Sequence, residues 1–271
     1  IGGTNYTIVE FQQLGSCTWL VPSGVTTIDA FGVGGGGGGG GNVGAGGSGG
    51  GSFYQTGVSL GGATFVTVSV GGGGAGAVDG NAGTGTINQD GSNGGNSTFT
   101  YGSTTLTAGG GLGGQTKWNN NVCVGSGAVD GYTAGGAAGP GGSTGGQGGA
   151  MATQVPSNAA AKPGSNGYTN NITGDYRWYA SGGGGGGWGG VGTYSLGGLY
   201  AGSGQDASVA GLSSPVANSG SGGGGGGSGC KAGGAGAAGV IIIRYVPVAV
   251  GVQLAVARAG LGSLSANAAV L

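Results

Sequence analysis

The hydrophobic positions of this chain fall in short runs with a period of two, which is the pattern of half-buried β-strands. In the run at 64–70, Val66, Val68 and Val70 share one face, whereas Phe65, Thr67 and Ser69 share the other. Comparable runs, bounded by turn residues, lie at 6–11, 17–21, 25–33, 51–60, 98–101 and 104–107. No segment shows the 3.6-residue apolar period of a helix. The pattern therefore predicts an all-β fold, an antiparallel sheet or sandwich with few or no helices.

Turn residues between the runs predict how the strands pair. The first three runs lie close together and are expected to form a meander. Gly61-Gly62 predicts a hairpin between the fourth and fifth runs, and Gly102-Ser103 predicts another between the sixth and seventh. The last run, Val240–Tyr245, is apolar at consecutive positions, which indicates a central strand buried on both faces. We expect it to close the sheet of the first strands.

Several of these strands lead directly into runs of glycine. Eight glycines, Gly34–Gly41, follow the run at 25–33, and Gly71–Gly74 follow the run at 64–70. Further runs lie at Gly109–Gly111, Gly182–Gly187 and Gly222–Gly227. Glycine contributes 83 of the 271 residues and proline only 6, and the glycines do not recur strictly at every third position. A collagen triple helix is therefore excluded.

The glycine runs are expected to be ordered. Disordered chains are rich in charge, whereas this one has 5% charged and 37% hydrophobic residues. Ordering eight glycines costs on the order of 10 kcal/mol, and without side chains the compensation must come from backbone hydrogen bonds between closely packed segments. An extended helix with three residues per turn directs every backbone group outward to a neighbour. The runs therefore predict a bundle of polyglycine II-like segments, with structural glycines at Gly34, Gly37, Gly41, Gly71, Gly74, Gly182, Gly187, Gly222 and Gly227.

The chain is expected to form one glycine-rich β domain over residues 1–247. An irregular, aromatic-rich insert is expected at about 112–181, and the apolar residues 248–271 form either a tail or the start of a further module. Aromatic side chains suit surface recognition because they supply a large contact area with few torsions to freeze. The candidates for such recognition are Trp118, Tyr176, Trp178, Tyr179 and Trp188. The alternative is that these rings cap the glycine bundle and exclude water.

The titratable residues do not indicate catalysis. The chain has no histidine, a single glutamate (Glu10) and scattered aspartates, so neither a catalytic triad nor a carboxylate pair is expected, and no metal site or cofactor. A net charge of −1 gives no electrostatic basis for binding nucleic acid. The longest apolar stretch, Val246–Ala257, is interrupted by polar and turn residues, so no membrane insertion is expected.

Two smaller patterns have structural interpretations. The cysteines Cys17, Cys123 and Cys230 are too widely spaced for a zinc site and are expected to be free, buried thiols, or to form one long-range disulfide at most. Asp-Gly pairs at 79–80, 90–91 and 130–131 lack the further carboxylates of a calcium loop. They are interpreted as turns in which glycine takes a positive φ.

The order of the elements resembles the glycine-rich domain of phage tail fibres, other virion proteins and some bacterial surface proteins. The similar motifs are WLVPSGVT at 19–26, leading through a strand to Gly34–Gly41, then FVTVSVGGGG at 65–74, GGNSTF at 94–99 and GVIIIRY at 239–245. The resemblance covers about residues 6–246 and implies no catalytic residues. Some phage adhesins look similar in holding variable recognition loops on packed polyglycine helices, which implies the same scaffold here. The insert at 112–181 and the residues after Pro247 depart from the pattern.

These observations lead to an expected function. We expect a non-enzymatic structural protein of a tailed-phage virion, a tail-fibre, tail-tip or decoration module with a role in host attachment. Its partners would be further copies of the chain or other virion proteins, and a glycan or protein of the host surface. The alternatives are an extracellular bacterial adhesin and an ice-binding or other extracellular protein built on a polyglycine bundle. An ice-binding protein would need a flat, regular face of small residues such as threonine.

Overall fold

The computed structural model describes residues 5–78, 90–116, 135–150, 161–187, 195–204, 214–229 and 231–248. Within these ranges the regular elements are all β-strands, and every pairing between them is antiparallel, so the fold is all-β as the sequence predicts. One sheet has the order β1 (Thr7–Phe11), β10 (Val240–Tyr245), β3 (Thr27–Val33) and β4 (Ser52–Ser59). A second has the order β2 (Gly15–Leu20), β5 (Phe65–Val70), β6 (Ser97–Tyr101) and β7 (Thr104–Ala108). The short strands β8 (Tyr168–Asn170) and β9 (Arg177–Tyr179) form a separate ribbon.

The two large sheets pack face to face as a sandwich. Val66, Val68 and Val70 of β5 point into its core, where they meet residues of the first sheet such as Phe53 and Ile243. The alternating pattern of β5 is thus confirmed, since Phe65 is exposed and Thr67 and Ser69 are only partly buried. Burying one face of each sheet removes the apolar side chains from water, which is the main driving force for this part of the fold.

The first sheet is covered on both faces. Its other face carries Phe31, Val33 and Ile242, which pack with Ile172 and Tyr179 of the β8–β9 region. Strand β10 therefore lies between two apolar layers, and Val240–Ile243 are all buried. The prediction of a central strand buried on both faces is confirmed, and so is its position between β1 and β3.

Two predicted strand pairings are wrong. The first three strands do not form a meander, because β2 belongs to the second sheet and β10 separates β1 from β3. Strands β4 and β5 do not form a hairpin either, since the positive-φ residues Gly61 and Gly62 lead the chain from one sheet to the other. Turn residues mark where a strand ends but do not determine which strand it pairs with. The β6–β7 hairpin around Gly102 is confirmed.

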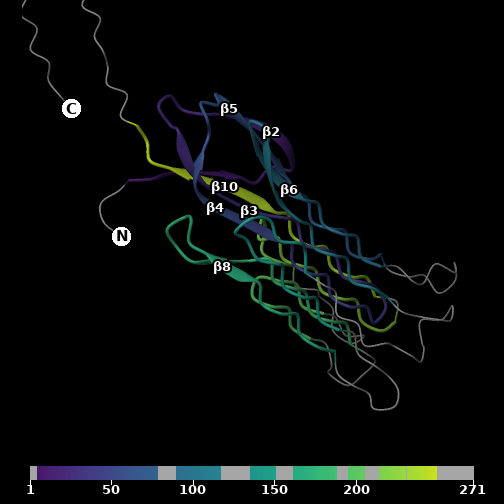
Figure 1. Cartoon of the computed structure of the whole chain (residues 1–271). Helices are drawn as coiled ribbons and strands as arrows, with labels where there is room; N and C mark the ends of the chain where they lie inside the picture. Colours follow the sequence, from purple (N-terminus) through teal and green to yellow (C-terminus); the bar gives the residue numbers. More distant parts are fainter. Residues whose placement is uncertain are drawn as a thin grey trace, which may run out of the picture.

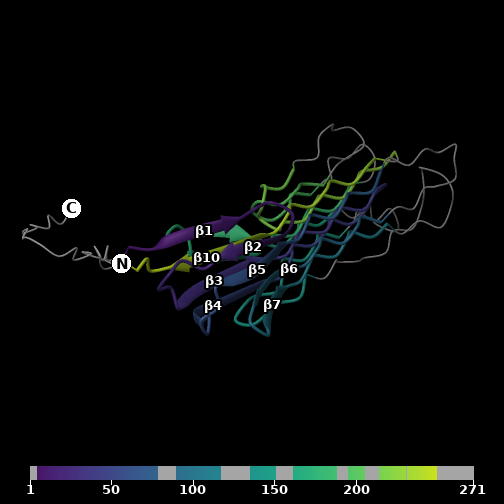
Figure 2. The same ribbon diagram turned by 90° about the horizontal axis from the view of Figure 1, so that it is seen from above.

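The glycine runs extend away from the sandwich as long, roughly parallel segments that lie side by side (Figures 1 and 2). We call each segment a rod and name it by its residues. The central one is rod 34–41, which continues directly from β3. It is bonded to the rods 44–51, 71–78, 91–96, 109–116, 220–227 and 231–239. The described parts of the predicted insert are more regular than expected, because they contribute further rods as well as the β8–β9 ribbon.

Hydrogen bonds around rod 34–41 repeat every three residues. Each backbone N–H of Gly34–Gly40 donates to a carbonyl of one of three neighbouring rods, at 2.8–2.9 Å between N and O, and every third donor reaches the same rod. Rod 44–51 accepts from Gly34, Gly37 and Gly40 at Gly51, Ser48 and Ala45. Rod 91–96 accepts from Gly35 and Gly38 at Gly95 and Ser92, and rod 231–239 accepts from Gly36 and Gly39 at Ala237 and Gly234. The carbonyls of Gly35 to Gly40 accept in the same rotation from rods 109–116, 71–78 and 220–227. A period of three is that of a polyproline II-type helix. Rod 34–41 is therefore surrounded on every side by backbone, as a bundle of polyglycine II-like segments requires.

Glycine is needed in this rod for space rather than for conformation. None of Gly34–Gly41 has a positive φ, so the backbone itself would accept other residues. A Cβ atom added at Gly37, however, would lie 2.0 Å from the carbonyl oxygen of Leu112, and one at Gly38 would lie 2.0 Å from that of Ala75. The larger apolar or uncharged side chains lie where a rod faces outward, as at the exposed Leu112 and Gln115 of rod 109–116, whereas the buried rod positions that are not glycine include small residues such as Ala45 and Ser48.

Candidate functional site

Of the five aromatic residues singled out from the sequence, three lie in the described part of the chain. Tyr176 is 76% exposed, Trp178 is half-buried and Tyr179 is only 5% exposed. Trp118 and Trp188 lie outside the described residues, as do Cys123 and Cys230. Cys17 is a free thiol but is exposed, so the expectation that it is buried is wrong. The glycines expected to be structural are buried without exception.

Tyr179 is mainly a core residue. Its ring packs against Phe31 in an edge-on arrangement with 5.0 Å between centroids, and stacks more loosely on Tyr168 at 6.4 Å. These contacts form the second core beneath the β8–β9 ribbon. Tyr179 is therefore nearly buried rather than freely exposed, because strand β9 alternates and turns this side chain toward the sheet, and it also contributes to the lining of the cavity beside Trp178.

Trp178 lines a surface cavity of about 310 Å³. One side comes from β9 and from Glu10 and Gln12 at the end of β1. The other side comes from two turns between rods, which contribute Tyr200 and Asn218. We call this cavity the Trp178 pocket. With Val240 and Ile242 of β10, it brings together residues from five separate parts of the sequence.

The charges in the Trp178 pocket are paired with each other. The Arg177 guanidinium donates to Glu10 Oε1 at 3.2 Å, and Gln12 Nε2 donates to Glu10 Oε2 at 2.9 Å. The Arg177 side chain is still 49% exposed and that of Glu10 26%, so both remain accessible to a ligand. The pocket therefore presents donors and acceptors without a net charge from this pair.

The backbone is strained at the pocket. Tyr200 has a φ of 67° and Asn218 a φ of 56°, both in the left-handed region that favours glycine. Such a conformation is uncommon for a bulky aromatic residue and costs about 1–3 kcal/mol. Neighbouring hydrogen bonds hold it in place: Val216 donates its N–H to the Tyr200 carbonyl at 2.9 Å, and Leu199 donates to Asn166 Oδ1 at 2.9 Å. Strain of this kind tends to occur at functional sites.

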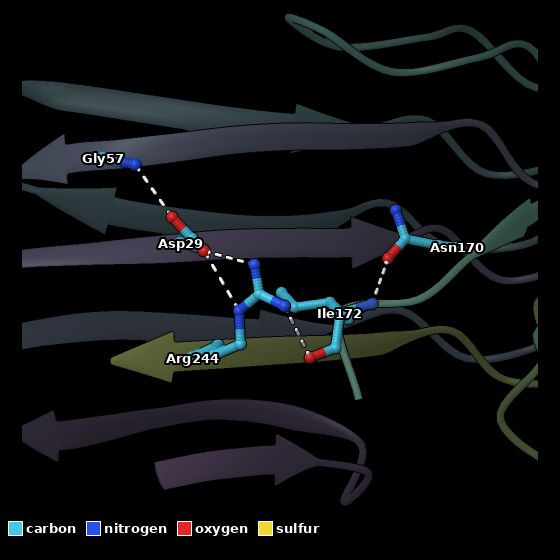
Figure 3. A network of polar contacts seen from close by, with 5 residues as sticks. All are labelled: Asp29, Gly57, Asn170, Ile172 and Arg244. Carbon is cyan, nitrogen blue, oxygen red and sulfur yellow. Dashed lines mark hydrogen bonds and ion pairs between the residues drawn. The ribbon is translucent and has the colours of Figure 1, made fainter. Parts of the chain in front are cut away.

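A polar network fixes the ribbon that carries Trp178 (Figure 3). Arg244 of β10 donates from Nε and Nη2 to Asp29 Oδ2 of β3, at 3.0 and 2.6 Å. Its Nη1 reaches the carbonyl of Ile172, in the turn between β8 and β9, at 3.4 Å. Asn170 Oδ1 accepts from the Ile172 N–H at 2.8 Å and so shapes the same turn. The network thus ties the ribbon to the centre of the first sheet.

Two titratable groups are shifted by these contacts. Burial by itself would lower the pKa of Arg244, but the Asp29 carboxylate more than offsets this, so the pKa stands above its ordinary value. Burial raises the pKa of the Tyr179 hydroxyl, the Arg177 guanidinium opposes the rise, and Glu10 adds to it. Arg244 and Tyr179 are therefore held firmly in their protonated forms and serve structural roles.

Within the described ranges, no three His, Cys, Asp or Glu side chains come close enough to hold a metal ion. The described residues likewise contain no helix long and apolar enough to cross a membrane.

Sequence reasoning found Trp178 but missed its partners in the pocket. Glu10 and Arg177 are 167 residues apart, and no local pattern connects them. Tyr200 was one of several tyrosines in a glycine-rich region, and its unusual φ has no signature in the sequence. Only the closure of the fold assembles these groups.

Comparison with known proteins agrees with the architecture. A search of curated proteins found no match to this chain. The family described as the glycine-rich domain matches residues 12–246. This span begins just after β1 and runs through the other strands and the described rods to the end of β10. The chain therefore belongs to the glycine-rich domain family.

Proposed function

We propose that the chain is a non-enzymatic structural protein of a tailed-phage virion, a tail-fibre, tail-tip or decoration module that contributes to host attachment. The observation that carries the proposal is rod 34–41, which is hydrogen-bonded on every side to other rods. Adjacent β-strands lead straight into such rods, as β3 does, so the sandwich and the bundle are one continuous body. An attachment device needs this stiffness, because it must hold a recognition surface at a set distance from its base.

The physical basis of the stiffness is the backbone network. At about 3.1 Å per residue, eight residues of a polyproline II-type helix span about 25 Å. Each rod is bonded to several others, so it cannot bend without breaking hydrogen bonds to its neighbours. The low charge of the chain also suits packing against other copies or other virion proteins.

Two measurements test the proposal. Antibodies against the purified chain should label one defined part of the phage particle in immuno-electron micrographs, and the purified chain should reduce phage adsorption to host cells. Labelling of bacterial cells in place of particles would show a cell-surface adhesin instead. Labelling of particles without any effect on adsorption would support a structural role in the virion and contradict a role in host attachment.

One face of the sandwich favours a second function, ice binding. The outward face of the second sheet carries two rows of hydroxyl side chains across its four strands. The rows are Thr18, Thr67, Thr100 and Thr105, and Ser16, Ser69, Thr98 and Thr107. Neighbouring strands are about 4.8 Å apart, so the hydroxyls form a regular array. Thr100 and Thr105 are close enough to share a hydrogen bond of 3.0 Å.

Thermal hysteresis of the purified chain tests this second function. A regular hydroxyl array that binds ice should produce a gap between freezing and melting temperatures, and Thr67→Lys should abolish it by placing a charge at the centre of the array. The ordinary twist of a sheet makes such an array less flat than an ice surface. Absence of hysteresis would leave the threonines as a solvated sheet face, where their β-branched side chains suit strand geometry.

A further inference from the structure

The Trp178 pocket has the size and exposure of a small-ligand site. Its volume of about 310 Å³ lies at the lower end of the range for small-molecule pockets. Tyr200 is 44% exposed and Val216 is 47% exposed, so its rim is open to solvent. Two aromatic side chains, Trp178 and Tyr200, come from different segments and offer apolar surface to one ligand.

The polar groups of the pocket narrow the chemistry of that ligand. Arg177 supplies donors, Glu10 supplies acceptors, and the amides of Gln12 and Asn218 supply both. Because Arg177 and Glu10 neutralise each other, the pocket offers no unpaired charge from this pair to an anion or a cation. The matching ligand is uncharged, bears several groups that both donate and accept, and has an apolar face to lie against a ring.

The positive φ of Tyr200 is consistent with a binding role for its side chain. Glycine would occupy the backbone conformation of Tyr200 without strain, and the chain uses glycine freely elsewhere. The tyrosine is nevertheless present, at a position where its side chain lines the pocket. Asn218, whose φ is also positive, places a polar side chain at the wall, although asparagine adopts this conformation more readily than tyrosine. Tyr200 therefore gives up stability for a side chain in the cavity.

We propose that the Trp178 pocket binds a neutral sugar unit. A pyranose ring has hydroxyl groups that donate and accept along its edge, and C–H groups that form an apolar face. The face would lie on Trp178 or Tyr200, and the hydroxyls would bond the planar groups of Glu10, Arg177 and Asn218. That the sugar belongs to a glycan of the host surface rests on the proposed function, whereas sugar binding itself does not.

Titration calorimetry with single sugars tests the proposal. The probes are the methyl glycosides of glucose, galactose, rhamnose and N-acetylglucosamine, with glucuronic acid as the charged comparison. At least one neutral glycoside should bind the purified chain with a Kd in the millimolar range or tighter, and glucuronic acid should bind at least tenfold more weakly. Trp178→Ala should weaken binding at least tenfold. Tyr176→Ala removes an exposed aromatic of the same ribbon outside the pocket and should leave binding unchanged.

Tyr200→Gly separates a binding role from a structural one. Relief of the positive φ should raise the melting temperature, while loss of the ring should weaken sugar binding at least fivefold. A variant that is both more stable and a poorer binder supports the proposal, and a variant that binds as well as the parent contradicts it.

The proposal is overturned if none of the neutral glycosides binds the folded chain, or if Trp178→Ala and Tyr176→Ala weaken binding equally. Its failure can be told apart from failure of the proposed function. A chain that labels phage particles and blocks adsorption but binds no sugar keeps the attachment role and loses the sugar site. A chain that binds sugar but is not found on phage particles by antibody labelling keeps the sugar site and loses the virion role.

Discussion

Asp29 and Arg244 stand directly opposite each other on β3 and β10, although they are 215 residues apart in the chain. Asp29 Oδ2 accepts both Arg244 bonds, at 3.0 and 2.6 Å, while its Oδ1 accepts from the Gly57 N–H of β4 at 2.9 Å. The carboxylate sits where the register between β3 and β4 shifts, next to Ile28. One side chain thus joins three strands at an irregular point of the first sheet.

Removing Arg244 should therefore destabilise the fold. Arg244→Leu leaves the mostly buried Asp29 carboxylate without its partner, and we expect a loss of about 2–3 kcal/mol in the free energy of unfolding. Denaturant titration measures the loss. The matched control is Arg177→Leu, whose ion pair with Glu10 is more exposed and should contribute less than about 1 kcal/mol. Equal losses in the two variants would contradict the role assigned to Asp29.

Two glycine-to-alanine substitutions should have opposite effects. Gly37→Ala places a Cβ 2.0 Å from the Leu112 carbonyl, which is fixed in a neighbouring rod, so we expect a loss of about 3 kcal/mol or more. Gly37→Val should be worse. Gly72→Ala faces only Leu14 at 3.7 Å and should raise stability by about 0.5 kcal/mol, because alanine restricts the unfolded chain. Melting curves of the two alanine variants decide the matter, and a Gly37→Ala variant that melts like the parent would refute the packing argument.

Asp90, Asn93 and Asn96 form a ladder along the edge of rod 109–116. Their side-chain oxygens accept from the N–H groups of Thr116, Gly113 and Gly110 at 2.6, 2.8 and 2.9 Å. The interpretation of Asp90-Gly91 as a positive-φ turn is wrong, since Gly91 lies in a rod and does not have a positive φ. Asn93→Ala should cost about 1 kcal/mol and should speed hydrogen exchange most at Gly113. Unchanged exchange at Gly113 would show that the ladder does not protect it.

The hydroxyl of Tyr168 is buried without a hydrogen-bond partner, although Ser52 lies close enough to moderate its pKa. Tyr168→Phe should therefore raise the free energy of unfolding by about 1 kcal/mol at neutral pH, because it removes an unsatisfied polar group. Denaturant titration at pH 7 measures this gain. A variant less stable than the parent would mean that the hydroxyl has a partner.

Tyr168 should also make the protein sensitive to alkali. Burial raises its pKa in the folded state well above the ordinary value, so above about pH 10 the unfolded chain loses a proton that the folded chain keeps. The free energy of unfolding of the parent should fall as pH rises from about 10, and that of the Tyr168→Phe variant should fall less steeply. Parallel slopes for the two proteins would contradict this assignment. The pKa of Tyr179 is also raised by burial, so Tyr179 lowers stability with rising pH in both the parent and the Tyr168→Phe variant.

Much of the local structure could be predicted from the residues themselves. The alternation of Val66, Val68 and Val70 identified a strand with one buried face, and the apolar run of β10 identified a central strand. The length of Gly34–Gly41 was sufficient to predict an extended, buried rod, because eight residues without side chains can be stabilised only by their backbone groups. These features are local, and local patterns of size and polarity determine them.

The tertiary structure alone decided how these pieces meet. It placed β2 and β3 in different sheets, because strand pairing depends on partners far along the chain. It turned Tyr179 into the core and Trp178 toward a pocket, and it brought Glu10, Arg177 and Tyr200 to the same cavity. The sequence by itself determined that the chain makes strands and glycine rods. Which rods touch, and which side chains share a site, follows from long-range packing that no short stretch of residues encodes.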